Sequence, residues 1–375
     1  MHQRHDTTIA SLTAATATPH DHPPVYHVSV VVPTYTRRAL LARTLDSLRR
    51  QVGGCVPYEV IVADNNSVDD TRELVADYAR SWPALRYVFE PRRGVSHARN
   101  AGIASSSAPI IAFIDDDVEA DPCWIANIKA AFDAYPEIDC IGGRIDGRWS
   151  APCPSWLTPR HWGAVALQGP KGATPYVDAD HASPCLMTAN FAARRAAIEE
   201  VGGFSPDFLR DEDRELQMRL WDAGKRGLYV GEIVVTTEVP PERLAKAYHR
   251  RFNARVGASH ARMQYLDRLD REGRLLRAPA RTSTLLGTPG FLYRALLWHI
   301  ARWIALLICL QWDRAFFHET RARYFAGYIW QRSFRDHRRP WTLPMELPRF
   351  LATIVARRMR RIASSANADV GSFQP

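Results

Sequence analysis

The chain has 375 residues, of which 46% are hydrophobic and 24% are charged. This composition is typical of a globular protein with a sizeable core, and it excludes a largely disordered chain. The net charge is +9, and residues 291–361 account for all of this excess, with 14 Arg, no Lys and 4 acidic residues. A basic segment suits an anionic membrane or a nucleic acid. Charge is the only feature that favours a nucleic acid, so we expect no nucleic-acid partner.

The two ends of the chain and the cysteines give little sign of function. Residues 1–24 lack apolar periodicity and the apolar centre of a signal peptide, so we expect a disordered tail there and a flexible tail at 362–375. The six cysteines form no CxxC pair, which argues against a zinc site. Together these features favour a reducing, cytosolic setting.

The first half of the chain alternates apolar runs with amphipathic segments. Four runs have the length of buried strands, at 28–33, 58–63, 85–89 and 110–114. Helical spacing of leucines follows the first run, and further helices are expected after the second and third. This order predicts an α/β fold with a doubly wound, mostly parallel sheet.

Three carboxylates, Asp115, Asp116 and Asp117, follow the fourth run directly. Adjacent like charges at the end of a buried strand must be solvated or neutralised, and a hard divalent cation that also bridges phosphates would neutralise them. Polar clusters at 33–36 and 64–67 end two other runs, and carboxyl ends of parallel strands build ligand sites at one sheet edge. Taken alone, the triplet suits a solvated turn that caps the next helix equally well.

Residues 139–145 begin a second half of different character. Proline and tryptophan crowd the segment 149–162, which predicts loops with β ribbons that hold a second substrate. Helices are expected at 196–202 and at 211–225, each ended by glycine.

A basic helical region is expected at 251–361. Its longest uncharged run, 303–312, has 10 residues, short of the roughly 20 that span a bilayer, so no transmembrane helix is predicted. One helix over 295–310 can instead lie on a membrane surface, with arginines toward anionic head groups. Its apolar side comprises Leu296, Leu297, Ile300, Trp303, Ile304 and Leu307. The alternative is a helical hairpin packed against the rest of the protein, with the arginines in solvent.

Five sequence runs between residues 28 and 226 resemble, in order and spacing, those of a family 2 glycosyltransferase. They are VSVVVPTYTR, EVIVADNNSVDDT, RRGVSHARNAG, IIAFIDDDVEADPCWI and EDRELQMRLWDAGKR. The resemblance implies a GT-A fold and an inverting, metal-dependent enzyme of the hexosyltransferase class that builds bacterial cell-surface polysaccharide. It also implies a catalytic domain at 25–250, with a nucleotide-binding half, 25–140, and an acceptor half, 141–250.

The resemblance assigns the donor site residue by residue. Asp117 matches the metal-binding aspartate for Mg²⁺ or Mn²⁺, with Asp115 and Asp116 toward the ribose and the metal. Asp64 matches the residue that reads the nucleobase, although it could also cap a helix. The remaining nucleotide-sugar-binding candidates are Pro33, Thr34, Tyr35, Arg99 and Asn100. The turn at 33–35 could simply end a strand, and Arg99 could form a structural salt bridge instead.

The acceptor hydroxyl needs a base, and the resemblance assigns this role to Asp213 of the Glu212–Asp213 pair. Adjacent carboxylates raise one another's pKa, which suits a base, but acids are also common at helix starts. One departure concerns Thr237, which stands where many relatives place a histidine that completes the metal shell. Glu238 or His249 could replace it, or the metal could be held by Asp117 and diphosphate alone. Asn65 stands where a second aspartate is common.

The sequence thus predicts transfer of a sugar, from a UDP-sugar in the first instance, to a cell-envelope glycan or lipid-linked acceptor. The expected location is cytoplasmic, peripheral on the inner face of the membrane. A sugar nucleotidyltransferase is a weaker alternative because the segment PTYTRR has no glycine for a phosphate loop. A non-catalytic nucleotide-sugar-binding protein would be expected to lack the base. The sequence does not identify the sugar, the acceptor or the linkage.

Overall fold

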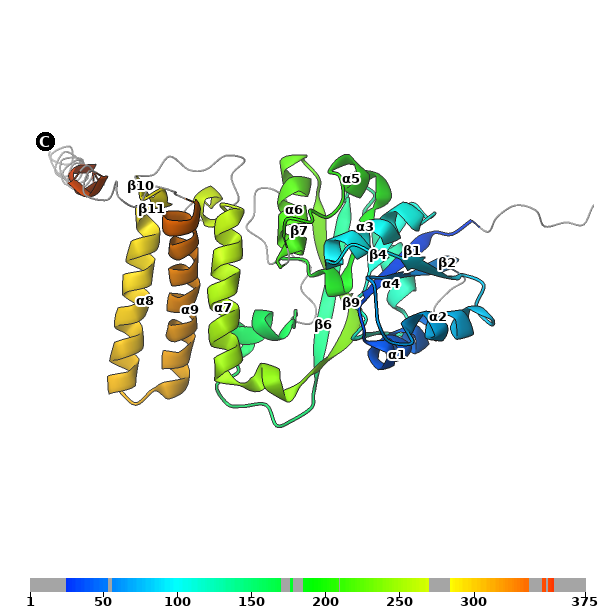
Figure 1. The fold of residues 1–375 in the computed structure, drawn as a ribbon, viewed down its shortest axis with the longest axis horizontal. Helices are drawn as coiled ribbons and strands as arrows, with labels where there is room; N and C mark the ends of the chain where they lie inside the picture. The colour runs from blue at the N-terminus through cyan, green and yellow to red at the C-terminus, as the bar shows by residue number, and fades with distance from the viewer. Residues whose placement is uncertain are drawn as a thin grey trace, which may run out of the picture.

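The computed structural model describes residues 25–52, 56–169, 176–177, 185–208, 210–269, 284–336, 346–348 and 350–353. The predicted tails and the arginines beyond residue 336 lie outside these ranges. Within them, an α/β body carries the sheet, and a bundle of long helices stands at one end of the molecule (Figure 1).

The first half of the sheet is parallel, as predicted. Its strands lie in the order β3-β2-β1-β4. Their bounds are β1 (Val28–Thr34), β2 (Tyr58–Asp64), β3 (Leu85–Phe89) and β4 (Ile110–Phe113). The helices that connect them are α1 (Arg38–Arg49), α2 (Thr71–Ala79) and α3 (Val95–Ser105).

Alternating side chains of β1 explain why helices cover both faces. Val30 and Val32 pack into the core that includes α1 and α2, whereas Val31 packs into the core on the α3 side. Successive side chains of a strand point to opposite faces, so a strand with valines on both faces requires a layer of helices on each. The predicted fold class is therefore confirmed.

The second half makes the sheet mixed. It continues from β4 in the order β8-β6-β9-β5, with β4–β8, β8–β6 and β9–β5 antiparallel and only β6–β9 parallel. The strands are β5 (Val118–Ala120), β6 (Cys140–Trp149), β8 (Phe191–Arg194) and β9 (Gly227–Val239), with β7 (Tyr176–Val177) paired to β9. The helices are α4 (Trp124–Ala134), α5 (Arg195–Glu200) and α6 (Glu212–Asp222).

The segment rich in proline and tryptophan differs from the expected ribbons. Proline fixes its own backbone angle and lacks a donor for sheet pairing. Here it begins the 3₁₀ helix η1 (Pro159–Val165) instead.

Three long helices in the described part of the chain form the C-terminal bundle: α7 (Lys246–Arg262), α8 (Gly290–Ile308) and α9 (Trp312–Trp330). The short strands β10 (Thr284–Leu285) and β11 (Thr288–Pro289) precede α8, and the π-helix η5 (Gln331–Asp336) follows α9. Helix α9 lies between the other two, so α8 is outermost (Figure 1).

Within the described residues, α8 is the helix long and apolar enough to cross a membrane, judged by length and composition alone. Its most apolar 18-residue window has a mean hydropathy of 1.4, and only 11% of that window is buried. The sequence predicted a helix over 295–310 here, but the prediction counted uninterrupted apolar runs, which Arg294 and Arg302 break, and so found none of membrane-spanning length. Length and composition do not separate a helix that spans a bilayer from one that lies on it.

Candidate active site

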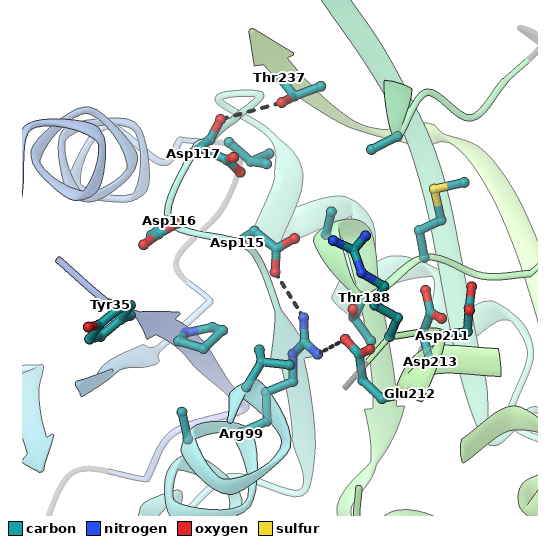
Figure 2. Close-up of a pocket in the computed structure, with 18 of the residues that line it drawn as sticks. Tyr35, Arg99, Asp115, Asp116, Asp117, Thr188, Asp211, Glu212, Asp213 and Thr237 are labelled. Carbon is teal, nitrogen blue, oxygen red and sulfur yellow. Dashed lines mark hydrogen bonds and ion pairs between the residues drawn. The ribbon is translucent and has the colours of Figure 1, made fainter. Parts of the chain in front are cut away.

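One cavity of about 790 Å³ opens where the two halves of the sheet meet. It is lined by the ends of β1 and β4, the start of α3, the start of α6, and α7. Figure 2 shows the aspartates of residues 115–117 on one side of this cavity and those of residues 211 and 213 on the other, with Arg99 between them. The volume suits a ligand of nucleotide-sugar size.

The acidic triplet lies at the cavity, as predicted, and two arginines partly neutralise it. Asp115 pairs with Arg99 at 3.0 Å, and Arg37 bridges Asp116 at 3.0 Å and Asp117 at 3.3 Å. The hydroxyl of Thr34 donates to the second oxygen of Asp116 at 2.7 Å. Each aspartate of the triplet therefore has an arginine contact.

Burial affects the protonation of Asp115 and Asp116. Desolvation raises the pKa of Asp116 to about 6, although Arg37 and Thr34 oppose the change. Burial also raises the pKa of Asp115, while Arg99 works in the opposite direction. These two neighbouring carboxyls ionise with difficulty. A cation that approaches them would stabilise their ionised forms and would therefore be attracted to this place.

Arg99 joins the two halves of the site. Its guanidinium contacts Asp115 and also Glu212 at 2.6 Å, and it lies over the ring of Phe204 at 5.2 Å from the centroid. The side chain is only 3% exposed. Burial opposes its charge, but Glu212 and Asp115 outweigh that effect and hold its pKa above the usual value. Arg99, for which the sequence left open a role in nucleotide-sugar binding or a structural salt bridge, therefore links the end of β4 to the start of α6.

Two predicted donor-site residues do not line the cavity. The carboxylate of Asp64 accepts from the backbone N–H of Ser67 at 2.9 Å and from the Tyr87 hydroxyl at 2.7 Å. The amide of Asn100 bonds both the backbone N–H and the carbonyl of Phe204, each at 2.8 Å. Both side chains find partners in their own surroundings. The bond from Ser67 to Asp64 is local in sequence, whereas the bonds between Asn100 and Phe204 form only through tertiary packing.

Pro33, Thr34 and Tyr35 do line the cavity, and so does Asn65. The Asn65 side chain accepts from the N–H of Gly94 at 2.7 Å and donates to the carbonyl of Arg92. Arg93 stacks over the Tyr35 ring at 4.4 Å. The turn after β1 and the loop before α3 thereby form one wall.

The start of α6 presents three consecutive acids. Glu212 turns to Arg99, while Asp211 and Asp213 point into the cavity together (Figure 2). Burial, followed by the charge of Glu212, raises the pKa of Asp213 to about 6. Burial, followed by the charge of Asp213, raises the pKa of Asp211 to about 7. A carboxyl with a pKa near neutrality is suited to take up a proton.

Sequence reasoning missed Asp211, Arg37 and the part of the wall that α7 provides. Asp211 adopts a left-handed backbone with φ of 58°, a conformation that non-glycine residues adopt rarely and often at functional sites. Phe252, Val256 and His260 of α7 also line the cavity. The signal available for Asp211 was its place beside Glu212 and Asp213, whereas α7 reaches the cavity only through tertiary packing.

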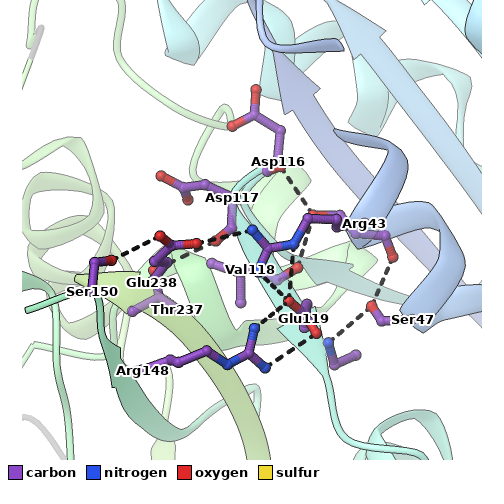
Figure 3. A network of polar contacts seen from close by, with 12 residues as sticks. Arg43, Ser47, Asp116, Asp117, Val118, Glu119, Arg148, Ser150, Thr237 and Glu238 are labelled. Carbon is purple, nitrogen blue, oxygen red and sulfur yellow. Dashed lines mark hydrogen bonds and ion pairs between the residues drawn. The ribbon is translucent and has the colours of Figure 1, made fainter. Parts of the chain in front are cut away.

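The strand that carries Thr237 sends alternate side chains in opposite directions. The Thr237 hydroxyl approaches the backbone carbonyl of Asp117 at 3.5 Å, and the residue lines the cavity. Glu238 turns away to Arg43 at 2.9 Å and Ser150 at 2.7 Å. Arg43 and Arg148 also bind Glu119, so this network ties α1 to β5, β6 and β9 (Figure 3).

His249 also lies away from the acidic triplet. Its Nε2–H donates to the carbonyl of Arg243 at 2.9 Å, and its ring packs 4.8 Å from that of Trp156. Neither Glu238 nor His249 lines the cavity, so neither replaces the histidine that the resemblance places at Thr237.

The chemistry of the donor set fits a hard cation shared with a ligand. Among the described residues, no group of three or more His, Cys, Asp or Glu side chains could enclose a metal. Asp116 and Asp117 nevertheless offer carboxylate oxygens in one place. Magnesium commonly binds through one or two carboxylates plus substrate phosphates, and manganese favours similar oxygen ligands. The residues therefore fit Mg²⁺ or Mn²⁺ bound together with a diphosphate.

Comparisons with known proteins agree with this geometry. A sequence model described as glycosyl transferase family 2 matches residues 29–202. The chain is 43% identical over 106 residues to validoxylamine A glucosyltransferase of Streptomyces hygroscopicus subsp. jinggangensis, which covers 28% of this chain and 25% of that relative. It is 32% identical over 94 residues to the GalNAc(5)-diNAcBac-PP-undecaprenol beta-1,3-glucosyltransferase of Campylobacter jejuni, covering 24% of this chain and 30% of the relative. These matches span about a quarter to a third of the relatives' length.

Among solved structures, a mannosyltransferase from Pyrobaculum calidifontis, in complex with GDP-Man and Mn²⁺, resembles the whole chain. The TM-score is 0.50 with 20% sequence identity, covering 94% of this chain and 84% of that one. At this identity the likeness shows the fold, which is that of the GT-A glycosyltransferases. Residues 29–202, which carry the acidic triplet and Arg99, thus match the model of glycosyl transferase family 2.

Proposed function

We propose that the protein is an inverting glycosyltransferase. It moves a sugar from a nucleoside diphosphate sugar to a hydroxyl of a cell-envelope glycan or a lipid-linked acceptor. The observation that carries this proposal is the meeting in one cavity of the acidic triplet with Asp213, held together through Arg99. A UDP-sugar is the first donor to test, and GDP-mannose is the second.

The geometry supports a single displacement. The acceptor oxygen attacks the anomeric carbon as the bond from that carbon to the diphosphate oxygen breaks, and the diphosphate leaves with the electron pair. Asp213 takes the proton of the attacking hydroxyl, for which its raised pKa suits it. Attack from the face opposite the leaving group inverts the anomeric configuration.

Asp117, together with Asp116, would hold Mg²⁺ or Mn²⁺ against the donor diphosphate. The cation would supply neutralisation of the charge that develops on the leaving group. The arginines on the cavity wall act in the same sense, since guanidinium groups bind phosphate oxygens in pairs. Arg93, stacked over Tyr35, faces the cavity on the donor side.

The Asp213→Asn variant tests the reaction. We expect it to keep donor affinity and to release nucleoside diphosphate at least about 10²-fold more slowly, the range for loss of a general base. Donor binding is measured by calorimetry, and diphosphate release is measured with water or glycans as acceptors. Near-normal turnover in the variant would assign the base to another residue.

We also propose that the bundle binds an anionic membrane surface, where a lipid-linked acceptor would present its sugar. Helix α8 is apolar on both sides. Leu296, Ile300 and Leu307 are half-buried, while Leu297, Ile304 and Ile308 are exposed by 65%, 51% and 76%. The exposed tryptophans Trp298 and Trp312 suit the interfacial region of a bilayer. Exposed apolar surface of this extent on one helix suits insertion at a lipid interface.

Liposome flotation tests this second proposal. The full chain should float with anionic vesicles at low salt, and the double change Leu297→Glu with Ile304→Glu should reduce flotation severalfold. Val68→Glu changes a residue that is 78% exposed on the catalytic domain and serves as the control. Flotation that the double change leaves intact would contradict a role for α8.

A further inference from the structure

The turn between β1 and α1 delivers an arginine to the acidic triplet. Thr36 takes a left-handed backbone with φ of 52°, and Arg37 follows as the residue before α1. A single nitrogen, Nη1 of Arg37, lies 3.0 Å from Asp116 and 3.3 Å from Asp117. It therefore stands between two carboxylate oxygens, where a cation shared by both aspartates would also stand.

The other oxygen of Asp116 is already occupied by the Thr34 hydroxyl. A cation that binds Asp116 through its remaining oxygen thus meets Arg37 at the same atom. The cavity already contains positive charge. Among the described residues, six arginines line it, as many as the carboxylates that line it. A divalent cation would have to compete with charge that the protein itself supplies.

The two arginines at the triplet differ in their freedom to leave. Arg99 has a side chain 3% exposed and is fixed between Asp115 and Glu212. The Arg37 side chain is 48% exposed and contacts only the two aspartates in the hydrogen bonds described. Asp116 and Asp117 are more buried, with side chains 6% and 23% exposed, so Arg37 is the member of these ion pairs that can move into solvent when another cation takes its place.

We propose that Arg37 competes with the divalent cation for Asp116 and Asp117, so that the cation binds tightly only together with the donor diphosphate. The inference rests on the proposed function for the diphosphate. A diphosphate adds negative charge that attracts both the cation and the displaced guanidinium. Arg37 is thus a positioning residue that couples the two ligands.

The experiment measures Mn²⁺ binding without nucleotide, by calorimetry, on the full chain. Arg37→Gln should bind Mn²⁺ about tenfold or more tightly than the wild type, the effect expected on removing a cation within contact of a carboxylate. Arg37→Ala should behave alike, and provides the comparison if the glutamine variant does not fold. Arg38→Gln removes the neighbouring exposed arginine, which makes no side-chain contact with the triplet in the bonds described, and should match the wild type.

UDP provides a second readout. It should raise Mn²⁺ affinity in the wild type, and this gain should shrink in Arg37→Gln. A merely structural Arg37 would leave Mn²⁺ affinity unchanged or weaken it on removal, and either result overturns the inference, as does undetectable Mn²⁺ binding in every variant. Tighter Mn²⁺ binding in Arg37→Gln without any nucleotide binding would uphold the competition while contradicting the proposed function.

Discussion

Single residues at the cavity act in charge pairs rather than alone. Asp115 and Glu212 share Arg99, and Asp116 and Asp117 share Arg37. Of these, Asp117 belongs to the pair proposed to hold the cation, and its backbone carbonyl accepts from the Thr237 hydroxyl. Its loss should therefore affect donor binding more than folding.

Asp117→Ala is expected to abolish metal-dependent donor binding while leaving the fold intact. The reason is that its carboxylate lies on the surface of the cavity and supports no buried contact besides Arg37 among the bonds described. UDP-sugar affinity with and without Mn²⁺ checks the first part, and thermal unfolding checks the second. Unchanged affinity in the presence of Mn²⁺ would contradict the role given to Asp117.

The pH dependence of turnover should report Asp213. Its pKa is raised to about 6, so the base is protonated and inactive below that pH. We expect kcat/KM for diphosphate release to fall as pH drops below about 6 and to level off above it. Because Asp211 lies beside it with a pKa raised to about 7, the apparent pKa belongs to the pair. If kcat/KM of Asp213→Asn still falls in the same way at low pH, a group other than Asp213 is responsible for the fall.

The sequence predicted that residues from several strand ends and a helix start lie close together, but it did not predict which side chains face the cavity. Asp115 to Asp117, Arg99, Glu212 and Asp213 meet at one cavity because strand ends and a helix start carry them there. Asp64 and Asn100 do not line it, since each bonds a backbone group nearby. A sequence motif predicts the path of the backbone. It does not predict which nearby group a short polar side chain will hydrogen-bond.

At the scale of helices and strands, the sequence predicted elements with a regular apolar pattern, but it did not predict which distant strands pair. The valines of β1 required two covered faces, and the parallel order of the first four strands followed from short crossover connections. The antiparallel partners β8 and β6 come from distant parts of the chain. Their placement depends on tertiary contacts rather than on alternation within each strand.

The contact between α7 and α9 depends on two glycines. A Cβ added to Gly327 would clash with the backbone carbonyl of Ala254, and one added to Gly257 would clash with that of Tyr324. The two helix backbones therefore approach closely at these points. Arg250 supports the same contact through Glu319.

Gly327→Ala should lower the free energy of unfolding by about 1–3 kcal/mol, the usual cost of overpacking. Chemical denaturation measures this difference. Gly163→Ala is the matched control, because a Cβ there meets no atom within 4 Å. Equal stability of the two variants would show that α7 and α9 separate easily.

At the scale of the whole molecule, an aromatic cluster joins the bundle to the α/β body. Trp156 contacts both His249 of α7 and Phe316 of α9, with ring centroids 4.8 and 4.7 Å apart. His161 of η1 stacks on Phe316 at 5.7 Å. The bundle is therefore packed on the α/β body, as one sequence interpretation held, while α8 stays exposed on its outer side.

His249 should make this junction sensitive to acid. Burial lowers its pKa from 6.5 to about 4, and its buried Nδ1 has no hydrogen-bond partner within the part of the chain that the structure describes. The unfolded chain takes up a proton below pH 6.5 and the folded protein does not until about pH 4. The stabilisation is therefore complete above pH 6.5 and is lost as pH falls toward 4.

The wild type should lose stability relative to His249→Gln over that interval. The glutamine can still donate to the Arg243 carbonyl but does not titrate. Comparing the two proteins cancels the opposite effect of Asp116 and Asp213, whose raised pKa values favour folding as pH falls. A difference in Tm that stays constant from pH 7 to pH 4 would contradict this account.

The central claim is tested most directly by incubating the full chain with Mn²⁺ and a panel of nucleoside diphosphate sugars, and measuring the products. At least one sugar nucleotide should raise the Tm in a Mn²⁺-dependent manner and be converted to nucleoside diphosphate, and Asp213→Asn should bind it without converting it. Stabilisation by none of the panel, or release of pyrophosphate from a nucleoside triphosphate and a sugar phosphate instead, would contradict a glycosyltransferase.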